Sequence, residues 1–219
     1  MKNNISICLL AAMFLASCSS SHIIYDVGLS KVEAPAEDAS KQYYDSTKIV
    51  KSEKRGKAKY KFEDDNIAVS WVVGIKTFTL ELKNKTDGDI KIPWLDAAYI
   101  DTAGETQEVT HCGDEKYLDT SSSQSVIVIP KDDVLNDVII PTANITYDAS
   151  APFDHDWRIT PIFGFPIDRK HIKEQKGSYI GRTVKIVLPI IIEGIKNEYV
   201  FEFKINDVSV KWQPFFMRL

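Results

Sequence analysis

The sequence lacks a long apolar run, an excess of basic residues and the common catalytic signatures. Its longest apolar stretch, residues 5–15, falls short of the roughly 20 residues that a membrane-spanning helix needs. The formal net charge is −4, which argues against a nucleic-acid-binding protein. There is no glycine-rich phosphate loop, no His-Glu-x-x-His and no Gly-x-Ser-x-Gly. No motif in the sequence therefore identifies an enzymatic activity.

The first residues have the three parts of a secretory signal. Lys2 supplies positive charge, residues 5–15 form an apolar segment with a single serine, and the small residues Ala16 and Ser17 follow. The apolar segment is too short to remain in the bilayer as a helix. We predict that residues 1–17 are a cleaved targeting segment.

The tetrapeptide Leu15-Ala16-Ser17-Cys18 resembles the lipobox of bacterial lipoproteins. The resemblance implies that a diacylglyceryl group is attached to the Cys18 thiol and that the chain is cleaved before Cys18. Two or three acyl chains anchor a protein stably, because each buried methylene contributes about 0.8 kcal/mol. The alternative is an ordinary secretory signal in which Cys18 is incidental.

The residues after Cys18 bear on the destination of such a lipoprotein. By analogy with Gram-negative sorting rules, the absence of an aspartate directly after Cys18 favours the outer membrane, and the absence of an acidic run favours its periplasmic face. The resemblance thus implies a cell-envelope protein that is held to a membrane through its N-terminal lipid. Secretion also argues against a nucleic-acid partner.

Cysteine is scarce, with three in 219 residues. Cys8 would leave with the signal and Cys18 would carry the lipid, so that Cys112 remains as the only thiol. The mature chain then forms no internal disulfide and no cysteine-rich zinc site. Its roughly 200 residues suffice for one domain that depends on its hydrophobic core alone.

The composition changes along the mature chain. Residues 18–58 are rich in Ser, Ala, Glu, Asp and Lys, which predicts a lipidated N-terminus and tether, although residues 23–25 and 43–44 are apolar enough to dock. A basic cluster at the end of this segment either contacts anionic headgroups or is a solvated linker, and we favour the linker. The cluster comprises Lys48, Lys51, Lys54, Arg55, Lys57, Lys59 and Lys61.

Apolar and polar residues alternate through much of residues 59–219, which predicts a β domain. The alternation is clean in residues 78–82 and 199–205, and Asp87-Gly88 is a strong turn signal. Many short strands with hardly any helical periodicity predict an all-β, antiparallel sandwich. We expect four tryptophans to fill or border its core: Trp71, Trp94, Trp157 and Trp212.

One long excursion, residues 150–180, interrupts the strand pattern with three prolines. Within it, residues 166–175 predict one short helix, because Pro166 stands near its start and Gly177 follows its end. The rest of the excursion is expected to be irregular.

Several segments resemble uncharacterised bacterial lipoproteins with an immunoglobulin-like β-sandwich. The segments are the turn Asn84-Lys85-Thr86 with the Ile-x-Ile-x-Trp strand after it, Ile129-Pro130, Leu188-Pro189 and the strand Tyr199–Ile205. The resemblance covers residues 60–212. It implies an immunoglobulin-like fold and brings no active site with it.

Three histidine-bearing clusters are candidates for chemistry, and His111-Cys112 is the first. A cysteine nucleophile needs a base within reach of its sulfur. Neighbours on a strand point to opposite faces, so these two side chains are not expected to pair. The pattern favours a strand that ends in a turn.

The other two clusters lie in the long excursion, where binding residues often occur. Asp154-His155-Asp156 has donors for a divalent cation, but it completes neither a zinc set nor a calcium loop, which favours an ordinary polar loop. On a helix His171 shares a face with acidic neighbours, a pattern also typical of a solvated helix. We predict no catalytic residue, metal ligand or cofactor, and take Asp154, His155, Asp156 and His171 as a candidate binding loop.

These observations favour a non-enzymatic, lipid-anchored module that binds or scaffolds an envelope protein or glycan. Exposed strand edges and the loop of residues 150–180 are the expected contact surfaces. One alternative is a hydrolase of envelope polymers, which requires a titratable pair such as Asp154 and His171 to converge in one cleft. Another is a metal or small-ligand binder centred on residues 154–156.

Overall fold

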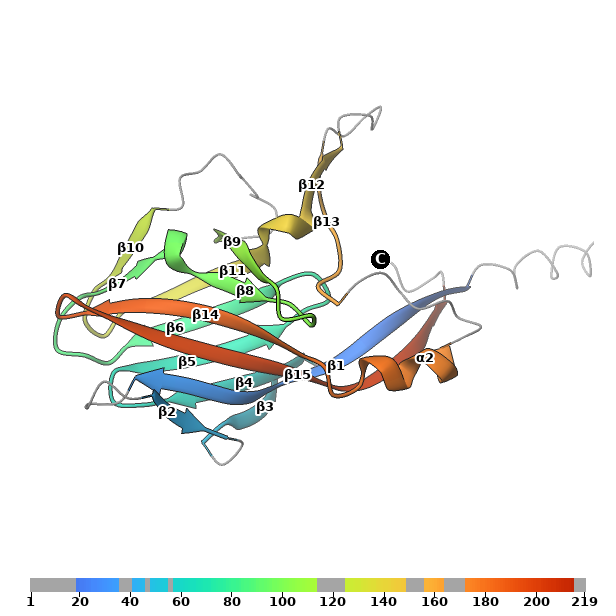
Figure 1. Ribbon diagram of the computed structural model, residues 1–219, viewed down its shortest axis with the longest axis horizontal. Helices are drawn as coiled ribbons and strands as arrows, with labels where there is room; N and C mark the ends of the chain where they lie inside the picture. The colour runs from blue at the N-terminus through green and yellow to red at the C-terminus, as the bar shows by residue number, and fades with distance from the viewer. Residues whose placement is uncertain are drawn as a thin grey trace, which may run out of the picture.

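The computed structural model describes residues 19–35, 41–45, 48–54, 57–113, 125–148, 156–163 and 172–214. In these ranges the fold is all-β and antiparallel (Figure 1), as the sequence predicts. Helix is limited to α2 (Ile172–Tyr179) and the short 3-10 turns η1 (Trp94–Asp96) and η3 (Thr142–Asn144). No helix within the described ranges has the length and apolar character needed to cross a membrane.

The strands form one large sheet and one separate hairpin. The strands are β1 (Ser19–Pro35), β2 (Lys41–Tyr44), β3 (Val50–Lys54), β4 (Lys57–Glu63), β5 (Ile67–Val73), β6 (Phe78–Asn84), β7 (Ile90–Pro93), β8 (Ala98–Ile100), β9 (Thr106–Cys112), β10 (Val126–Ile129), β11 (Val134–Pro141), β12 (Ile145–Asp148), β13 (Asp156–Ile159), β14 (Thr183–Ile192) and β15 (Ile195–Pro214). The main path of the sheet is β2-β1-β15-β14-β8-β9-β11-β6-β5-β4-β3, with β7 beside β14 and β10 beside β7. Strands β12 and β13 pair only with each other among the described residues.

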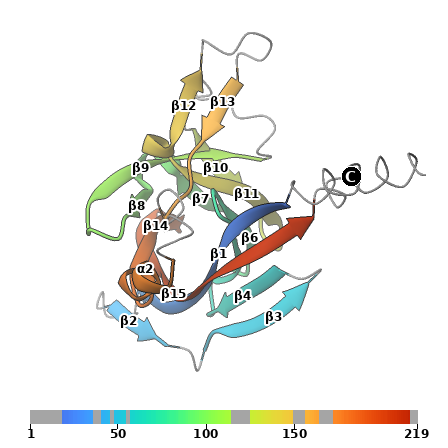
Figure 2. The same ribbon diagram turned by 90° about the vertical axis from the view of Figure 1, so that its right-hand side faces the viewer.

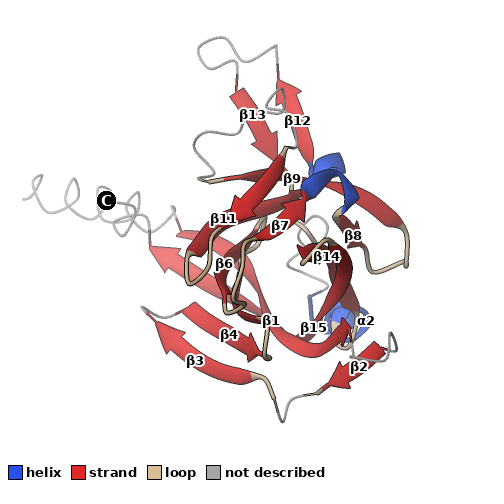
Figure 3. Ribbon diagram, turned by 90° about the vertical axis from the view of Figure 1, so that its left-hand side faces the viewer, coloured by secondary structure: helices blue, strands red, loops and turns tan. Residues whose placement is uncertain are grey.

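The large sheet curls until its two halves face each other across a shared core (Figure 2). Aromatic rings fill the space between the halves. Phe201 of β15 lies 5.1 Å from Trp71 of β5, and Phe203 lies 5.1 Å from Phe78 of β6, between ring centroids. Figure 3 shows the same arrangement from the opposite end, with strands on all sides of the interior. The buried aromatic and aliphatic side chains are the main stabilising term, because burial of each contributes about 1.5–3 kcal/mol.

The clean period-two segments become strands with one buried face. In β6 every second residue from Phe78 to Asn84 is buried and the residues between them are exposed. Strand β14 is buried more continuously, since it lies between β15 on one side and β7 and β8 on the other. Strand β6 matches the sequence prediction because its alternation is uninterrupted.

The prediction of a tether over residues 18–58 is wrong for the described part of that segment. Strand β1 pairs with β15 from Ser19 to Glu33, and Val27, Leu29 and Val32 are buried in the core. Irregularities at positions 26–27 and 29–31 shift the buried positions from odd to even numbers. The shift conceals the strand pattern, because a bulge breaks strict period-two alternation.

Strands β1 and β4 meet where the curled sheet nearly closes. An atom at the Cβ position of Gly28 would lie 2.9 Å from Tyr60 Oη and 3.0 Å from Asn206 Nδ2. Gly28 therefore allows the two halves to approach more closely than any side chain would. Farther along, Tyr44 at the end of β2 packs on Phe62 of β4, with 5.1 Å between ring centroids.

Two further details differ from the sequence prediction. Trp71 and Trp94 are buried as expected, but Trp157 is 38% exposed because it lies on the separate hairpin and not on the large sheet. Trp212 belongs to β15, and its side chain lies outside the described residues. Helix α2 continues through Gly177 to Tyr179, beyond the predicted end, whereas residues 166–171 of the predicted helix lie outside the described residues.

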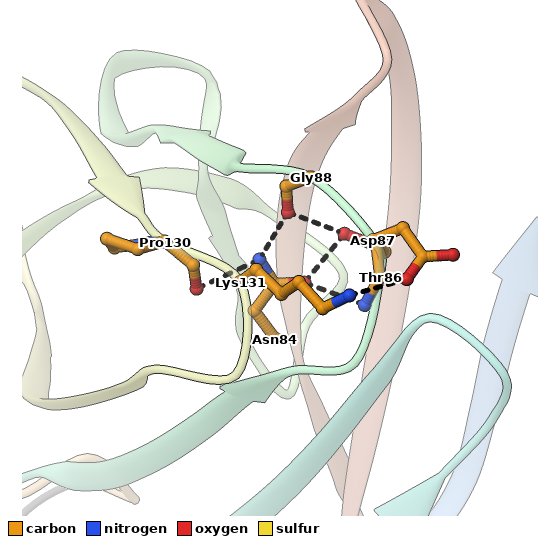
Figure 4. A network of polar contacts seen from close by, with 6 residues as sticks. All are labelled: Asn84, Thr86, Asp87, Gly88, Pro130 and Lys131. Carbon is orange, nitrogen blue, oxygen red and sulfur yellow. Dashed lines mark hydrogen bonds and ion pairs between the residues drawn. The ribbon is translucent and has the colours of Figure 1, made fainter.

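At one end of the sheet a buried asparagine ties two turns together (Figure 4). Asn84 Nδ2 donates to the carbonyls of Gly88, Ile129 and Pro130 at 2.8–3.1 Å. Asn84 Oδ1 accepts from the backbone N–H of Thr86 at 2.9 Å and lies 2.8 Å from the Thr86 hydroxyl. Each polar atom of the side chain is thereby satisfied, as burial requires.

Candidate functional site

Most residues of the candidate binding loop lie outside the described residues. Asp154, His155 and His171 belong to this group, so the structure does not test whether Asp154 and His171 converge. Cys18, the predicted lipidation site, also lies outside the described residues. Asp156 is the first residue of β13, and its backbone pairs with that of Asp148 in β12. Asp154 and His155 therefore come between two strands that pair as a regular hairpin, and His171 follows the hairpin in the sequence. Strand β13 lies in the excursion that the sequence analysis expected to be irregular.

The hairpin β12–β13 projects from the body of the molecule (Figure 1). Its face has two parts, because Ile145 pairs with Ile159 at the base and Tyr147 pairs with Trp157 farther out. The two isoleucines pack against a small cluster that contains Cys112 and Ile140. This cluster fixes the hairpin to the outer side of β9 and β11.

Farther from the body, the same face of the hairpin carries two exposed aromatic rings. Tyr147 is 52% exposed and Trp157 is 38% exposed. Their ring centroids lie 5.1 Å apart with the planes tilted by 58°. We call these two residues the aromatic pair. Together they form an apolar surface that already has a defined geometry.

The segment that follows β13 returns to the body and is held there. Thr160 and Asn144 bond each other through backbone and side-chain groups, and the N–H of Ile162 donates to the carbonyl of Ile75 at 2.9 Å. Ile162 and Phe163 are buried in the main core. The base of the hairpin is thus fixed at both ends, so the aromatic pair is presented by a rigid support.

The His111-Cys112 cluster behaves as strand geometry predicts. Cys112 packs with Ile140 on one side of the sheet, whereas His111 lies on the other side against Trp94. The imidazole stacks on the indole with 4.3 Å between centroids and 13° between planes. The two neighbours therefore share no face.

His111 instead pairs with a carboxylate that the sequence analysis did not single out. Its Nδ1 lies 2.9 Å from Oδ2 of Asp137, a residue of β11 that is 3% exposed. The other carboxylate oxygen accepts the N–H of Val138 at 2.8 Å. A buried carboxylate without such partners would be costly. We interpret the pair as a polar tie between β9 and β11.

A groove of about 710 Å³ opens between β1 and strands β3 to β5. Its apolar lining includes Tyr25, Val27, Val73 and Ile75, and its charged residues are Asp26, Lys51, Glu53, Lys57 and Lys76. Two members of the basic cluster of the sequence, Lys51 and Lys57, line this groove from the hairpin β3–β4, which also carries Lys59 and Lys61. These residues belong to a paired strand structure and not to the linker that we predicted.

The described residues contain no group of three or more His, Cys, Asp or Glu side chains that could hold a metal ion. The aromatic pair is the feature that the structure adds, since the sequence analysis placed Trp157 in or beside the core and did not single out Tyr147. A sequence signal for it exists, because Tyr147 and Trp157 flank a short polar segment, residues 148–156, that contains three aspartates and one proline. Period-two alternation alone does not show that the apolar face of this hairpin extends beyond the sheet on which it packs.

Comparison with known proteins gives no match. No protein-family model fits the chain, and neither a curated protein nor a solved structure is significantly similar to it.

Proposed function

We propose that this chain is a lipid-anchored cell-envelope protein that acts as a non-enzymatic binding or scaffolding module. The observation that carries the proposal is the aromatic pair Tyr147–Trp157 on a projecting hairpin. Exposed aromatic rings that are held rigidly are typical of binding surfaces, since they bury a large area at a low cost in conformational entropy.

The partner in this proposal is another envelope component, either a protein or a glycan. Aromatic rings suit both, because they pack against apolar side chains and against the C–H faces of sugars. The polar face of the hairpin adds Thr146 and Arg158, which are exposed.

The anchor in this proposal is the Cys18 lipid, which the lipobox resemblance implies. Ser19, the next residue, is the first residue of β1. The proposed location is the periplasmic face of the outer membrane. Intact mass measurement of the membrane-extracted protein tests the anchor. A lipidated chain that begins at Cys18 is heavier than the unmodified chain by the mass of the diacylglyceryl and acyl groups.

We also propose that the domain is a distant form of the immunoglobulin-like β-sandwich. The supporting observation is that two antiparallel halves pack face to face through Trp71, Phe78, Phe201 and Phe203. The proposed likeness is one of two packed layers and not of strand order, because the main sheet follows one continuous path around the core. Phe201→Ala should cost about 3–5 kcal/mol and destabilise both halves in a single unfolding transition. Separate unfolding of the two halves would overturn the proposal.

Crosslinking in cells tests the binding function. The lipidated full chain is crosslinked with formaldehyde, and captured proteins are identified by mass spectrometry. The double variant Tyr147→Ala/Trp157→Ala should weaken binding of the partner by about thirty-fold, because central aromatic residues contribute about 2 kcal/mol or more at interfaces. Both side chains are partly exposed, so thermal unfolding of the variant should change little.

Tyr43→Ala is the matched control, because Tyr43 is 59% exposed on β2. A partner that the control captures and the double variant loses supports the proposal. If no protein is captured, binding of the same three proteins to purified envelope glycans decides the case. Equal binding by wild type and double variant in both assays would contradict the proposal.

A further inference from the structure

The two ends of the curled sheet differ in charge. At the end that faces away from β1's first residues, three turns carry six aspartates: Asp64, Asp65, Asp87, Asp89, Asp132 and Asp133. Hydrogen bonds between these turns, such as Asn84 N–H to Asp133 carbonyl and Lys85 N–H to Asn66 carbonyl, show that they lie side by side. Lys85 and Lys131 form ion pairs there and offset only part of the negative charge.

The opposite end of the sheet is basic around the groove between β1 and β3 to β5. Three basic residues line the groove, against Asp26 and Glu53: Lys51, Lys57 and Lys76. Strands β4 and β5 each have seven residues and separate this end from the acidic turns by roughly 23 Å.

Within the described residues, Lys57 and Lys76 are exposed and have no ion-pair partner. They differ in this respect from Lys59, which binds Glu81 at 3.0 Å, and Lys61, which binds Glu63 at 2.6 Å. Beside Lys76, Ile75 is 45% exposed. The basic end therefore combines unneutralised charge with an exposed aliphatic side chain.

The basic end is also the end from which β1 and β15 extend as a two-stranded ribbon (Figure 1). Ile24, Tyr25 and Asp26 of the ribbon line the groove, and Ser19 lies five residues before Ile24. Five extended residues span roughly 17 Å. A lipid on Cys18 would therefore hold the bilayer within reach of Lys57 and Lys76.

We propose that the basic end of the sheet, with Lys57 and Lys76 at its centre, binds the anionic phospholipid headgroups of the membrane that holds the anchor. The inference rests on the proposed lipidation of Cys18 and adds a second contact to it. Attraction to anionic lipid acts on basic groups near the surface, and the six aspartates at the opposite end are repelled. The two effects orient the long axis of the molecule.

Energy transfer to labelled lipids tests the orientation. The lipidated full chain is reconstituted in phosphatidylcholine vesicles with or without roughly 30 mol % phosphatidylglycerol, the anionic component. A donor dye is placed at the basic end with Ser52→Cys or at the acidic end with Gly88→Cys, both exposed positions. Native Cys112 is buried and Cys18 carries the lipid, so the introduced thiol is the one that reacts.

We expect phosphatidylglycerol to increase transfer from position 52 relative to position 88, and about 0.5 M salt to abolish the increase by screening. The variant Lys57→Glu/Lys76→Glu should lower the ratio of oriented to unoriented molecules by at least about thirty-fold, because the loss of two lysine contacts alone amounts to about 2 kcal/mol. The matched control is Lys83→Glu/Lys91→Glu, which makes the same change of charge at exposed positions away from the groove. This control should keep the orientation.

The outcomes separate the anchor from the surface. The membrane contact is overturned if the chain floats with vesicles but phosphatidylglycerol does not change its orientation. It is also overturned if the Lys57/Lys76 variant keeps the same orientation as its control. Neither result contradicts the proposed lipid anchor. If the chain lacks the added mass of the lipid and does not float with vesicles, both the lipid anchor and the membrane contact are overturned. Orientation that is lost only in the Lys57/Lys76 variant and at high salt supports the inference.

Discussion

Asn84 is a fully buried polar side chain that holds backbone groups of two separate turns. Asn84→Ala would leave three carbonyls and the Thr86 N–H without these partners. We expect a loss of about 3 kcal/mol in the free energy of unfolding, because buried polar groups without partners cost about 1–3 kcal/mol each and water satisfies some of them. Urea unfolding measures the loss.

Lys83→Ala is the control for Asn84, since Lys83 is the adjacent exposed residue of β6. This change should stay within about 0.5 kcal/mol. Asn84→Asp is a second test, because the carboxylate has the same shape but no N–H groups to donate. A loss below about 1 kcal/mol for both Asn84 variants would show that the turns do not depend on this side chain.

Glu63 gives the protein a defined dependence on acid. Hydrogen bonds from Lys61 and Lys85 lower the pKa of Glu63 from 4.5 to about 2. A pKa that is lower in the folded state means stability that is present above pH 4.5 and lost as the pH falls towards 2. Solvent screens this exposed network, so we expect a small effect.

Glu63→Gln should therefore reduce stability at pH 7 and have no effect near pH 2. Urea midpoints of wild type and variant, measured between these values, should converge as the pH falls. The variant Lys61→Gln/Lys85→Gln removes the cause of the shift and should weaken the dependence on pH in the same window. A constant difference between wild type and Glu63→Gln would contradict the assignment.

At the scale of elements, β1 is the strand that joins the N-terminal segment to the core. Gly28 lies close to β4, because a Cβ atom there would meet Tyr60 Oη at 2.9 Å. We expect Gly28→Ala to cost about 1–3 kcal/mol, the usual effect of overpacking. Thermal or urea unfolding measures this loss.

Tyr60→Phe supplies the matched test, since it removes the atom that the new methyl group would meet. The Tyr60 hydroxyl is buried and has no hydrogen-bond partner among the described residues, so this change alone should cost little. The double variant should recover part of the stability that Gly28→Ala loses. Strict additivity of the two changes would show that β1 and β4 do not meet at this point.

The hairpin β12–β13 is the element whose role depends most on its position. Its inner residue pair, Ile145 and Ile159, joins a small cluster with Cys112, whereas the outer pair, Tyr147 and Trp157, is exposed. Alternation in the sequence is the same for both pairs. The supporting sheet ends between the two pairs, so one pair is partly buried against it and the other is exposed.

At the scale of the whole molecule, a curled sheet with turns at both ends separates charge along its length. The acidic turns gather at one end because β4, β6 and β10 all finish there. The basic hairpin β3–β4 and the ribbon β1–β15 lie at the other end. A lipid on Cys18 would place the basic end nearest to the membrane, and the orientation experiment tests this arrangement as a whole.

The sequence by itself determined the all-β class, since strict alternation in segments such as residues 78–84 leaves one apolar face that has to be buried. Tertiary structure decided what alternation does not encode. It placed β1 in the core despite its shift of phase, paired His111 with Asp137 across 26 residues, and left Trp157 exposed. The physical reason is that strand pairing and the facing of sheets depend on distant partners, whereas period two records only that a strand has two faces.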